Sequence, residues 1–507
     1  MLKNRKIWAI ILGFAFFKIV IHLILSTNYG LQRDAYLYYS LGQHLAWGYV
    51  SVPPLIAILA RISTLIFGNT VFALRLLPAL IGSLSVIIIG KMVLELGGKK
   101  NAVTIALTAF TFTTAFLRSN TLFQPVSFNQ FFWLLSAYLV VRLINTQKPV
   151  YWIYIFIIWG IAFLNKYSIA FIIISTLIAI LFSPHRKLLW AKYFFIGATT
   201  SLFIILPNIY WQATHNWPVI HHMSELQKNQ LINVKISGFL IDQITMNIPA
   251  LIVWIAGLFG LLFMRSLKKY RAIAYIYLGT VLIIILFKGK SYYTLGLYST
   301  LIAFGGYTID KYFKAGQKYT VILFVILLAI PLLPISLPVL SYQNAANYTK
   351  KVAAFTNRWE DGKVHNIPQD YADMTGWKEL STIVIQHYKS LSKKERTDCS
   401  IFTDNYGQAG AIYFYGKEAN LPRPVSFSDN FLLWAPDSAD ISSLIYVGDK
   451  LAKLTSLFNR IEKIGQVNNQ FFRENGVKVY YCTEPADSFY QIYKERVSSF
   501  KKKYQSF

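Results

Sequence analysis

Eleven apolar runs occupy most of the first 340 residues of this chain. Many approach the length of about 20 residues with which a helix crosses a bilayer core about 30 Å thick. Backbone polar groups cannot stay unpaired in lipid, so such runs must fold as helices. We therefore predict a polytopic α-helical membrane protein with about eleven transmembrane helices. The runs are residues 7–25, 71–94, 102–117, 127–144, 151–164, 168–183, 193–206, 247–264, 272–287, 293–309 and 319–340.

The charged residues are unevenly distributed along the chain. Only 14% of all residues are charged, against about 25% in soluble proteins, and only five of the 23 acidic residues precede position 340. We therefore predict a membrane domain over residues 1–340 and a water-soluble domain over residues 341–507.

Basic residues predict the orientation in the membrane. The apolar run 7–25 follows Lys3, Arg5 and Lys6, has no small-residue cleavage site after it, and is interpreted as a retained first helix. Every second loop is basic, as cytoplasmic loops are. This pattern places the N-terminus in the cytoplasm and residues 341–507 outside, and it accounts for the net charge of +27 without nucleic-acid binding. The basic positions are Lys99, Lys100, Arg142, Lys148, Arg186, Lys187, Lys192, Arg265, Lys268, Lys269, Arg271, Lys311, Lys314 and Lys318.

Two long segments, 26–70 and 207–246, lie on the outer side in this topology. The first contains two amphipathic stretches, 34–47 and 53–67, which are expected to form helices in the membrane interface. Long connections of this kind are often functional.

The last third of the chain predicts a small mixed α/β domain. Strands are expected over 400–403, 411–415, 444–447 and 477–481, and helices over 377–390, 449–457 and 489–504. The two cysteines, Cys399 and Cys482, each adjoin an expected strand. An extracytoplasmic location would allow a disulfide between them, whereas burial as two free thiols is the alternative.

Acidic residues in the outer segments are candidates for catalysis, because ionisable groups near a membrane are costly. Glu95 and Asp310 fall on the cytoplasmic side, which leaves Asp34, Glu225 and Asp242 outside. A general base at the outer face would come from these three or from the tail. Asp34 also has a structural interpretation as the N-cap of a helix.

Basic residues on the outer side favour an anionic ligand such as a phosphate. Contact with lipid headgroups is the alternative. The histidines of the 207–246 segment are able to titrate or bind metal, but no carboxylate cluster accompanies them. No cofactor can be read from the sequence, and dependence on a divalent metal stays open. The basic positions are Arg33, Arg61, Arg75, Lys166, Lys288 and Lys290, and the histidines are His215, His221 and His222.

Several of these positions form a recognisable pattern. The segments 33–36, 43–49, 53–57, 67–68 and 74–79 together resemble the first outer loop of bacterial GT-C glycosyltransferases. The branch is similar to dolichyl-phosphate-mannose protein mannosyltransferases and to the aminoarabinose transferase of lipid A. Segments 165–168, 206–218 and 288–293 fall where that branch has its later outer loops, and 403–411 with 414–416 resembles its periplasmic domain.

The resemblance implies a bacterial inner-membrane enzyme that moves a sugar from a polyprenyl-phosphate donor to a lipid, glycan or protein acceptor at the outer face. In this interpretation Asp34, with Glu225, activates the acceptor. The basic residues bind the donor, with Lys166, Lys288 and Lys290 beside the carrier phosphate. Tyr167, Tyr292 and Tyr293 join them as substrate-binding candidates.

The chain departs from the family pattern at one point. Family members usually have two consecutive acids in the first loop, whereas Ala35 follows Asp34 here, and residues 96–224 contain no acid. Two alternatives therefore stay open: a catalytically silent lipid-binding protein of the same fold, and a membrane transporter or flippase.

Overall fold

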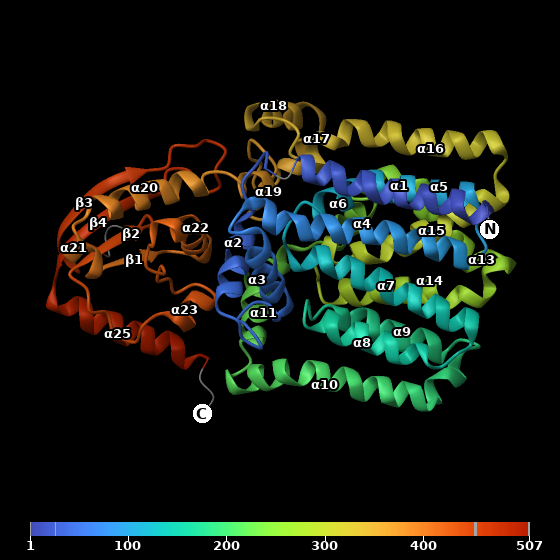
Figure 1. Ribbon diagram of the computed structural model, residues 1–507, viewed down its shortest axis with the longest axis horizontal. Helices are drawn as coiled ribbons and strands as arrows, with labels where there is room; N and C mark the ends of the chain where they lie inside the picture. Colours follow the sequence, from blue (N-terminus) through green and yellow to red (C-terminus); the bar gives the residue numbers. More distant parts are fainter. Residues whose placement is uncertain (1, 26, 451–453, 505–507) are drawn as a thin grey trace. The chain divides into compact units, whose positions relative to one another are not determined.

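The computed structural model describes residues 2–25, 27–450 and 454–504 and is mostly helical (Figure 1). The chain forms two compact units. The helical unit comprises Met1–Ser26, Leu74–Ile209 and Ser224–Val339, and the tail unit comprises Thr27–Ala73, Tyr210–Met223 and Leu340–Phe507. These units differ from the continuous segments 1–340 and 341–507, because both outer segments contribute to the tail unit. The extracytoplasmic location of 341–507 stays a prediction.

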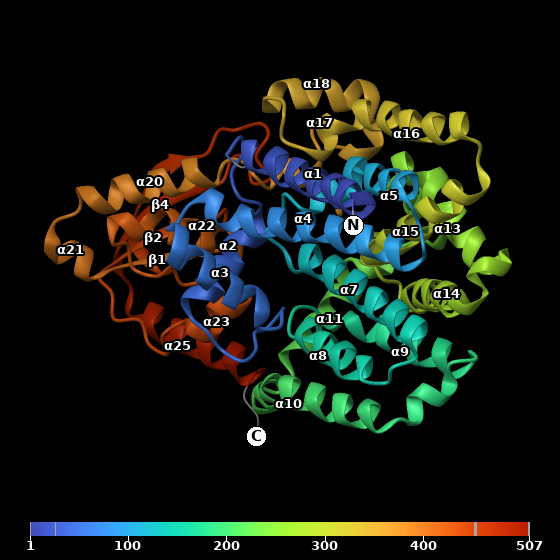
Figure 2. The same ribbon diagram turned by 45° about the vertical axis from the view of Figure 1, so that its right-hand side comes forward.

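The helical unit is a bundle whose long helices run roughly parallel to one another in both views (Figures 1 and 2). Its buried surface is almost entirely aliphatic and aromatic, as expected where every backbone polar group is satisfied inside a helix. Its helices are α1 (Leu2–Ile24), α4 (Val71–Glu95), α5 (Lys100–Phe112), α6 (Thr114–Ser119), α7 (Pro125–Thr146), α8 (Tyr151–Phe163), α9 (Ile169–Leu181), α10 (Lys192–Thr214), α11 (Pro218–Asn229), α12 (Ile236–Thr245), α13 (Leu251–Phe263), α14 (Arg271–Leu286), α15 (Leu295–Tyr312), α16 (Ala315–Ala329) and α17 (Leu333–Ser336).

Six helices within the described residues are long and apolar enough to cross a membrane, so the chain is a multi-pass membrane protein. A seventh span results if the bent pair Ile236–Thr245 and Ile248–Phe263 is one crossing. The six are Arg5–Ile24, Val71–Glu95, Pro125–Thr146, Lys192–Thr214, Arg265–Leu286 and Ala315–Ser336.

The remaining predicted spans are shorter or broken. The run 102–117 divides into α5 and α6 at Thr113, whose backbone is extended. Helices α8 and α9 have 13 residues each, which at about 1.5 Å per residue is about 20 Å. The total of eleven crossings therefore stays a prediction.

The tail unit contains a four-stranded sheet with strand order β1-β2-β4-β3, in which only β1 and β2 are parallel. Helices lie on both sides of the sheet in both views (Figures 1 and 2), and every residue of β2 is buried. Its elements are α2 (Arg33–Gln43), α3 (Leu55–Phe67), α18 (Tyr342–Val352), α19 (Gln369–Ala372), α20 (Trp377–Ser390), α21 (Lys393–Thr397), β1 (Cys399–Thr403), α22 (Tyr406–Gly416), α23 (Asn430–Trp434), β2 (Ser443–Val447), β3 (Phe458–Gln466), β4 (Lys478–Pro485) and α25 (Asp487–Lys502).

One strand prediction for the tail was wrong, and one strand was missed. Residues 411–415 lie in helix α22, which Asn405 initiates by accepting hydrogen bonds from the amides of Gly407 and Gln408. Strand β3 was missed because it is an edge strand that carries the exposed charged residues Arg460, Glu462 and Lys463, a pattern typical of protected edges. Residues 451–453 of the helix expected over 449–457 lie outside the described residues.

The outer segment 26–70 forms helices, but α2 is not a surface helix. Eight of its eleven residues are buried, because α3 and α22 pack against it. Helix α3 exposes Ile62, Leu65 and Ile66, as an interfacial helix does.

The two cysteines are free and buried. Cys399 pairs with Ser443 of β2, whereas Cys482 pairs with the next residue, Leu444. Strand β2 thus separates the cysteines by two strand spacings, about 10 Å, and they point to opposite faces of the sheet. A disulfide needs Cα atoms within about 7 Å, so the structure does not support the pairing.

We expect both thiols to stay reduced in protein purified without reductant. Burial raises the pKa of Cys399 above its usual range and that of Cys482 to about 12, which makes both thiols unreactive in the folded state. Unfolding in the presence of iodoacetamide, followed by mass spectrometry, should show two alkylated cysteines. A linked peptide pair would contradict the fold of the sheet.

Candidate functional site

The N-cap of helix α2 is Gln32, not Asp34. The Gln32 side-chain oxygen accepts a hydrogen bond of 2.8 Å from the amide of Asp34. Asp34 therefore lies in the first turn of the helix, where the helix dipole favours a negative charge. Its carboxylate is not used for capping and is available for other contacts.

Tyr406 of α22 joins the two charges at the start of α2. Its hydroxyl donates a hydrogen bond of 2.8 Å to Oδ1 of Asp34, and its ring lies 4.4 Å from the guanidinium carbon of Arg33. Burial, reinforced by the nearby Asp34 carboxylate, raises the pKa of Tyr406 well above its usual range, so the phenol stays protonated and remains a donor. Such cation–π and charge-assisted contacts are strongest where water is excluded.

Two glycines allow α22 to approach α2 this closely. A Cβ atom on Gly410 would lie 2.8 Å from the backbone of Tyr36, and one on Gly407 would lie 2.8 Å from the side chain of Arg33. A larger residue at position 410 would displace one of the two helices, whereas one at position 407 would displace the Arg33 side chain. The spacing of these glycines therefore determines where Tyr406 meets Asp34.

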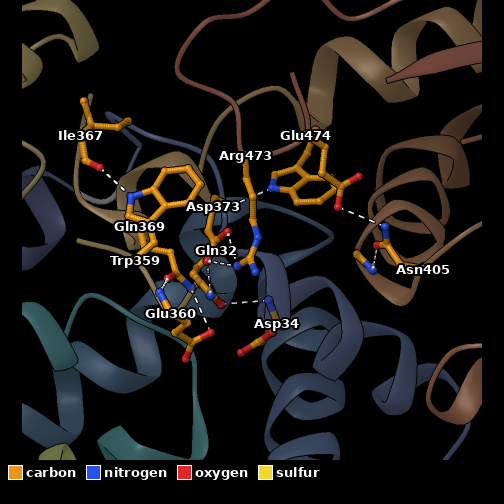
Figure 3. A network of polar contacts seen from close by, with 12 residues as sticks. Gln32, Asp34, Trp359, Glu360, Ile367, Gln369, Asp373, Asn405, Arg473 and Glu474 are labelled. Atoms are coloured by element: carbon orange, nitrogen blue, oxygen red, sulfur yellow. Dashed lines mark hydrogen bonds and ion pairs between the residues drawn. The ribbon is translucent and has the colours of Figure 1, made fainter. Parts of the chain in front are cut away.

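A second carboxylate, Asp373, lies close to Gln32 and Asp34 at the start of α2 (Figure 3). Oδ2 of Asp373 accepts a hydrogen bond of 3.2 Å from the side-chain amide of Gln32. Arg473 donates to both oxygens of Asp373 at 3.1 and 3.3 Å. Asp373 is only 1% exposed. Burial raises its pKa to about 7, although the positive charge of Arg473 lowers it. The negative charge of Asp34 also raises the pKa of Asp373.

Asp429 is a third carboxylate in this region of the tail unit. Its backbone has a φ of 52°, in the left-handed region, and its side chain bonds to Ser51. Burial raises its pKa, and Asp34 contributes in the same direction. The electrostatic interaction of three carboxylates is typical of sites that handle protons.

A separate basic site lies in the helical unit. The Lys166 ammonium lies 4.3 Å from the ring centre of Tyr293 and 5.5 Å from that of Tyr292. Lys166 follows α8 and lies outside the helices. Burial, with a smaller contribution from Lys290, lowers its pKa to about 8. In the described part of the chain no carboxylate pairs with Lys166, which favours an anionic ligand.

Helix α12 holds the two tyrosines of this basic site. They belong to a 3₁₀ turn, Ser291–Thr294. The hydroxyl of Ser291 donates to Asp242 at 2.6 Å, and that of Thr294 donates to Gln243 at 2.5 Å. Asp242, a candidate base from the sequence, thus binds the turn that carries Tyr292 and Tyr293.

The other predicted site residues are dispersed. Arg61 of α3 donates to Gln43 at 3.0 Å, and Arg75 is buried in α4 of the helical unit. Tyr167 donates to Asn208 at 3.0 Å. Lys288 is exposed in the left-handed turn after α14.

Glu225 is exposed on α11 and belongs to a different compact unit from Asp34, so its joint role with Asp34 stays a prediction.

The structure describes no group of three or more metal-ligating side chains. His215 stacks on Trp211 at 4.1 Å, and His221 contacts the ring of Tyr504 at 6.2 Å.

Sequence reasoning missed Tyr406, Asp373, Asp429 and Arg473. Tyr406 lies inside the segment 403–411 that resembles the family, but nothing in the sequence linked it to Asp34. Asp373 and Asp429 could not be distinguished by sequence from the many other acids of the tail, because their burial comes from long-range packing.

These features define the class of protein: a multi-pass membrane protein with the GT-C fold and a mixed α/β tail. The fold matches that of ArnT from Cupriavidus metallidurans, solved bound to undecaprenyl phosphate, with a TM-score of 0.62 and 12% identity over 94% of this chain and 98% of that one. The apo structure of ArnT matches equally well, with a TM-score of 0.62 and 13% identity over the same shares of the two chains.

Sequence comparison gives relatives in the same class. Residues 51–211 match the family model of dolichyl-phosphate-mannose-protein mannosyltransferase, which confirms the resemblance. The matched range includes Lys166 and excludes Asp34. Lipid A galacturonosyltransferase RgtD of Rhizobium johnstonii is 25% identical over 226 residues, which is 43% of this chain and 45% of RgtD. The match thus spans less than half the length of RgtD.

We expect Gly410→Ala to destabilise the tail unit by about 1 to 3 kcal/mol, since the added methyl group overpacks the contact between α22 and α2. Thermal unfolding in detergent measures the effect. Gly238→Ala is the matched control, because a Cβ atom at this helical glycine of α12 has no heavy atom within 4 Å. The control should be neutral or stabilising by up to about 1 kcal/mol. Equal melting temperatures for the two variants would contradict the close approach.

Proposed function

We propose that the protein is a glycosyltransferase of the bacterial inner membrane. It transfers a sugar from a polyprenyl-phosphate donor to a hydroxyl of a lipid acceptor of the lipid A type at the outer face. The observation that carries this proposal is the part-buried hydrogen bond from Tyr406 to Asp34 at the start of α2, where the ring of Tyr406 also contacts Arg33. The acceptor class is proposed from RgtD, a lipid A galacturonosyltransferase, and the carrier from ArnT, which was solved bound to undecaprenyl phosphate.

In the proposed reaction Asp34 is the general base. It takes the proton of the acceptor hydroxyl while the acceptor oxygen bonds to the anomeric carbon of the sugar. The bond between that carbon and the phosphate oxygen breaks, and polyprenyl phosphate leaves with the electron pair. Tyr406 holds Oδ1 of Asp34 in one orientation, which favours proton transfer in a fixed geometry.

Lys166 is proposed to bind the carrier phosphate. Its ammonium is confined by the two tyrosine rings, and a phosphate would supply the counter-charge that no described carboxylate gives it. A positive charge on the leaving phosphate also stabilises the charge that develops as the bond breaks.

Asp34→Asn should lower turnover about 10² to 10⁴-fold, the usual cost of removing a general base. The variant should stay folded, because Gln32 caps the helix and an asparagine oxygen still accepts a bond from Tyr406. The assay uses membranes with a panel of radiolabelled undecaprenyl-phosphate sugars and lipid A as the acceptor.

Asp440→Asn provides the control for this assay, since Asp440 is an exposed acid of the same unit and should leave turnover unchanged. Normal turnover by folded Asp34→Asn protein would remove Asp34 from catalysis. If the wild-type protein bound undecaprenyl phosphate but transferred none of the sugars, the catalytically silent alternative would replace this proposal.

Donor binding should weaken as the pH rises through about 8, because the pKa of Lys166 is lowered to about 8 and the neutral amine no longer attracts phosphate. Calorimetry with undecaprenyl phosphate between pH 6.5 and 9.5 follows this change. Lys166→Arg should bind well throughout, since a guanidinium stays protonated. Lys166→Ala should weaken binding at least about tenfold at pH 7, consistent with loss of a charge-assisted bond. Identical pH profiles for the wild type and Lys166→Arg would exclude this role.

A further inference from the structure

We propose that Arg473 and Glu474, adjacent in the loop between β3 and β4, are positioning residues for Asp34. The proposal rests on the proposed role of Asp34 as the base. Figure 3 shows the two side chains leaving this loop in different directions. A chain of hydrogen bonds connects Arg473 to the backbone of Asp34. A second chain of contacts connects Glu474, through the first turn of α22, to the carboxylate of Asp34.

The path from Arg473 ends at the amide of Asp34. Arg473 donates to both oxygens of Asp373, Asp373 accepts from the side-chain amide of Gln32, and the oxygen of that amide accepts from the Asp34 N–H. Gln32 has its two ends occupied and cannot rotate without losing a bond. The charge of Arg473 thus determines the orientation of the residue that caps α2.

The path from Glu474 ends at the carboxylate of Asp34. Its two oxygens accept from the side-chain amides of Asn405 at 3.0 Å and Gln408 at 2.7 Å. Asn405 caps α22, and Gln408 also accepts from the Asp404 amide at 3.0 Å. Glu474 therefore fixes the first turn of α22, which carries Tyr406.

The loop between β3 and β4 is anchored to the rest of the tail unit by backbone hydrogen bonds and a ring contact. Val467 and Val477 are joined by a backbone hydrogen bond of 3.0 Å, and the amide of Arg473 donates to the carbonyl of Ala372 at 3.3 Å. The ring of Phe472 packs edge-on against Trp377 at 4.8 Å. Two successive residues of one anchored loop thus control the two contacts that orient Asp34, as supporting shells do in designed active sites.

Glu474→Gln and Arg473→Gln are the test variants. Glu462→Gln and Arg460→Gln are the matched controls, because both residues are exposed on the adjoining strand β3. With the undecaprenyl-phosphate sugar that the wild type consumes, each test variant should lose about 10 to 10²-fold in kcat, the effect of a misplaced catalytic group. KM for the donor should match that of the controls. A loss confined to the melting temperature, or an unchanged kcat, would overturn the proposal.

A second measurement separates this proposal from the proposed function. In an Asp34→Asn background, Glu474→Gln should cause no further loss of turnover, because the group that it positions is already gone. Normal turnover by Asp34→Asn would refute the general base; an inactive Asp34→Asn beside a normal Glu474→Gln would refute only the positioning role.

Hydrogen exchange tests the structural claim without turnover. Arg473→Gln should speed exchange of the Asp34 amide, whereas Arg460→Gln should not, and equal rates would overturn the first path. If Arg473→Gln does not fold, because Asp373 is left buried without its charged partner, the double variant Asp373→Asn/Arg473→Gln replaces it. That variant removes both charges and should show the same faster exchange.

Discussion

Helix α2 begins with an arginine and an aspartate and is then buried along most of its length. This burial determines how helix α22 packs within the tail unit. Charges beside a buried helix destabilise the fold unless they are bonded. Tyr406 contacts both charges at once, which requires helix α22 to lie directly on α2. The glycines at positions 407 and 410 make that distance attainable. The first outer segment and the tail therefore belong to one compact unit, although helices α2 and α22 are more than 300 residues apart in the sequence.

The two candidate sites use tyrosines in different ways. In the tail unit the Tyr406 hydroxyl donates to a carboxylate, and its raised pKa keeps the proton on the phenol. In the helical unit the faces of Tyr292 and Tyr293 surround an ammonium; a ring face attracts the cation without cancelling its charge. A lysine held by a carboxylate would have its charge already matched, whereas a lysine held by rings keeps an attraction for phosphate. The Tyr406 phenol thus remains a hydrogen-bond donor to the proposed base, and Lys166 keeps its attraction for phosphate.

The sequence predicted the polytopic membrane class, the GT-C resemblance, three of the four strands of the tail and its helices α20 and α25, because long apolar runs and the segment 33–36 are local signals. It also brought Lys166 together with Tyr292 and Tyr293 as one group of candidates. It did not predict helix 406–416, since the run 411–415 is rich in aromatic residues, which favour strands. The features that favour a helix here are the cap at Asn405 and the packing of Gly410 against α2. Asp373 and Arg473 could not be selected either. Their importance comes from burial and from contacts with Gln32, which are properties of the fold and not of neighbouring residues.

The alanine at position 35 follows from the same burial of α2. Ala35 is only 1% exposed, so a carboxylate there would replace a methyl group in the packed interior of the tail unit. An ionised side chain without a partner is expelled from such a position or loses its charge. Asp373 instead approaches the start of the helix from the tail, bonded to Gln32 and compensated by Arg473. The loss of the second consecutive acid therefore does not leave Asp34 as the sole carboxylate of this region. A second carboxylate, Asp373, lies in a segment where an arginine pairs with it.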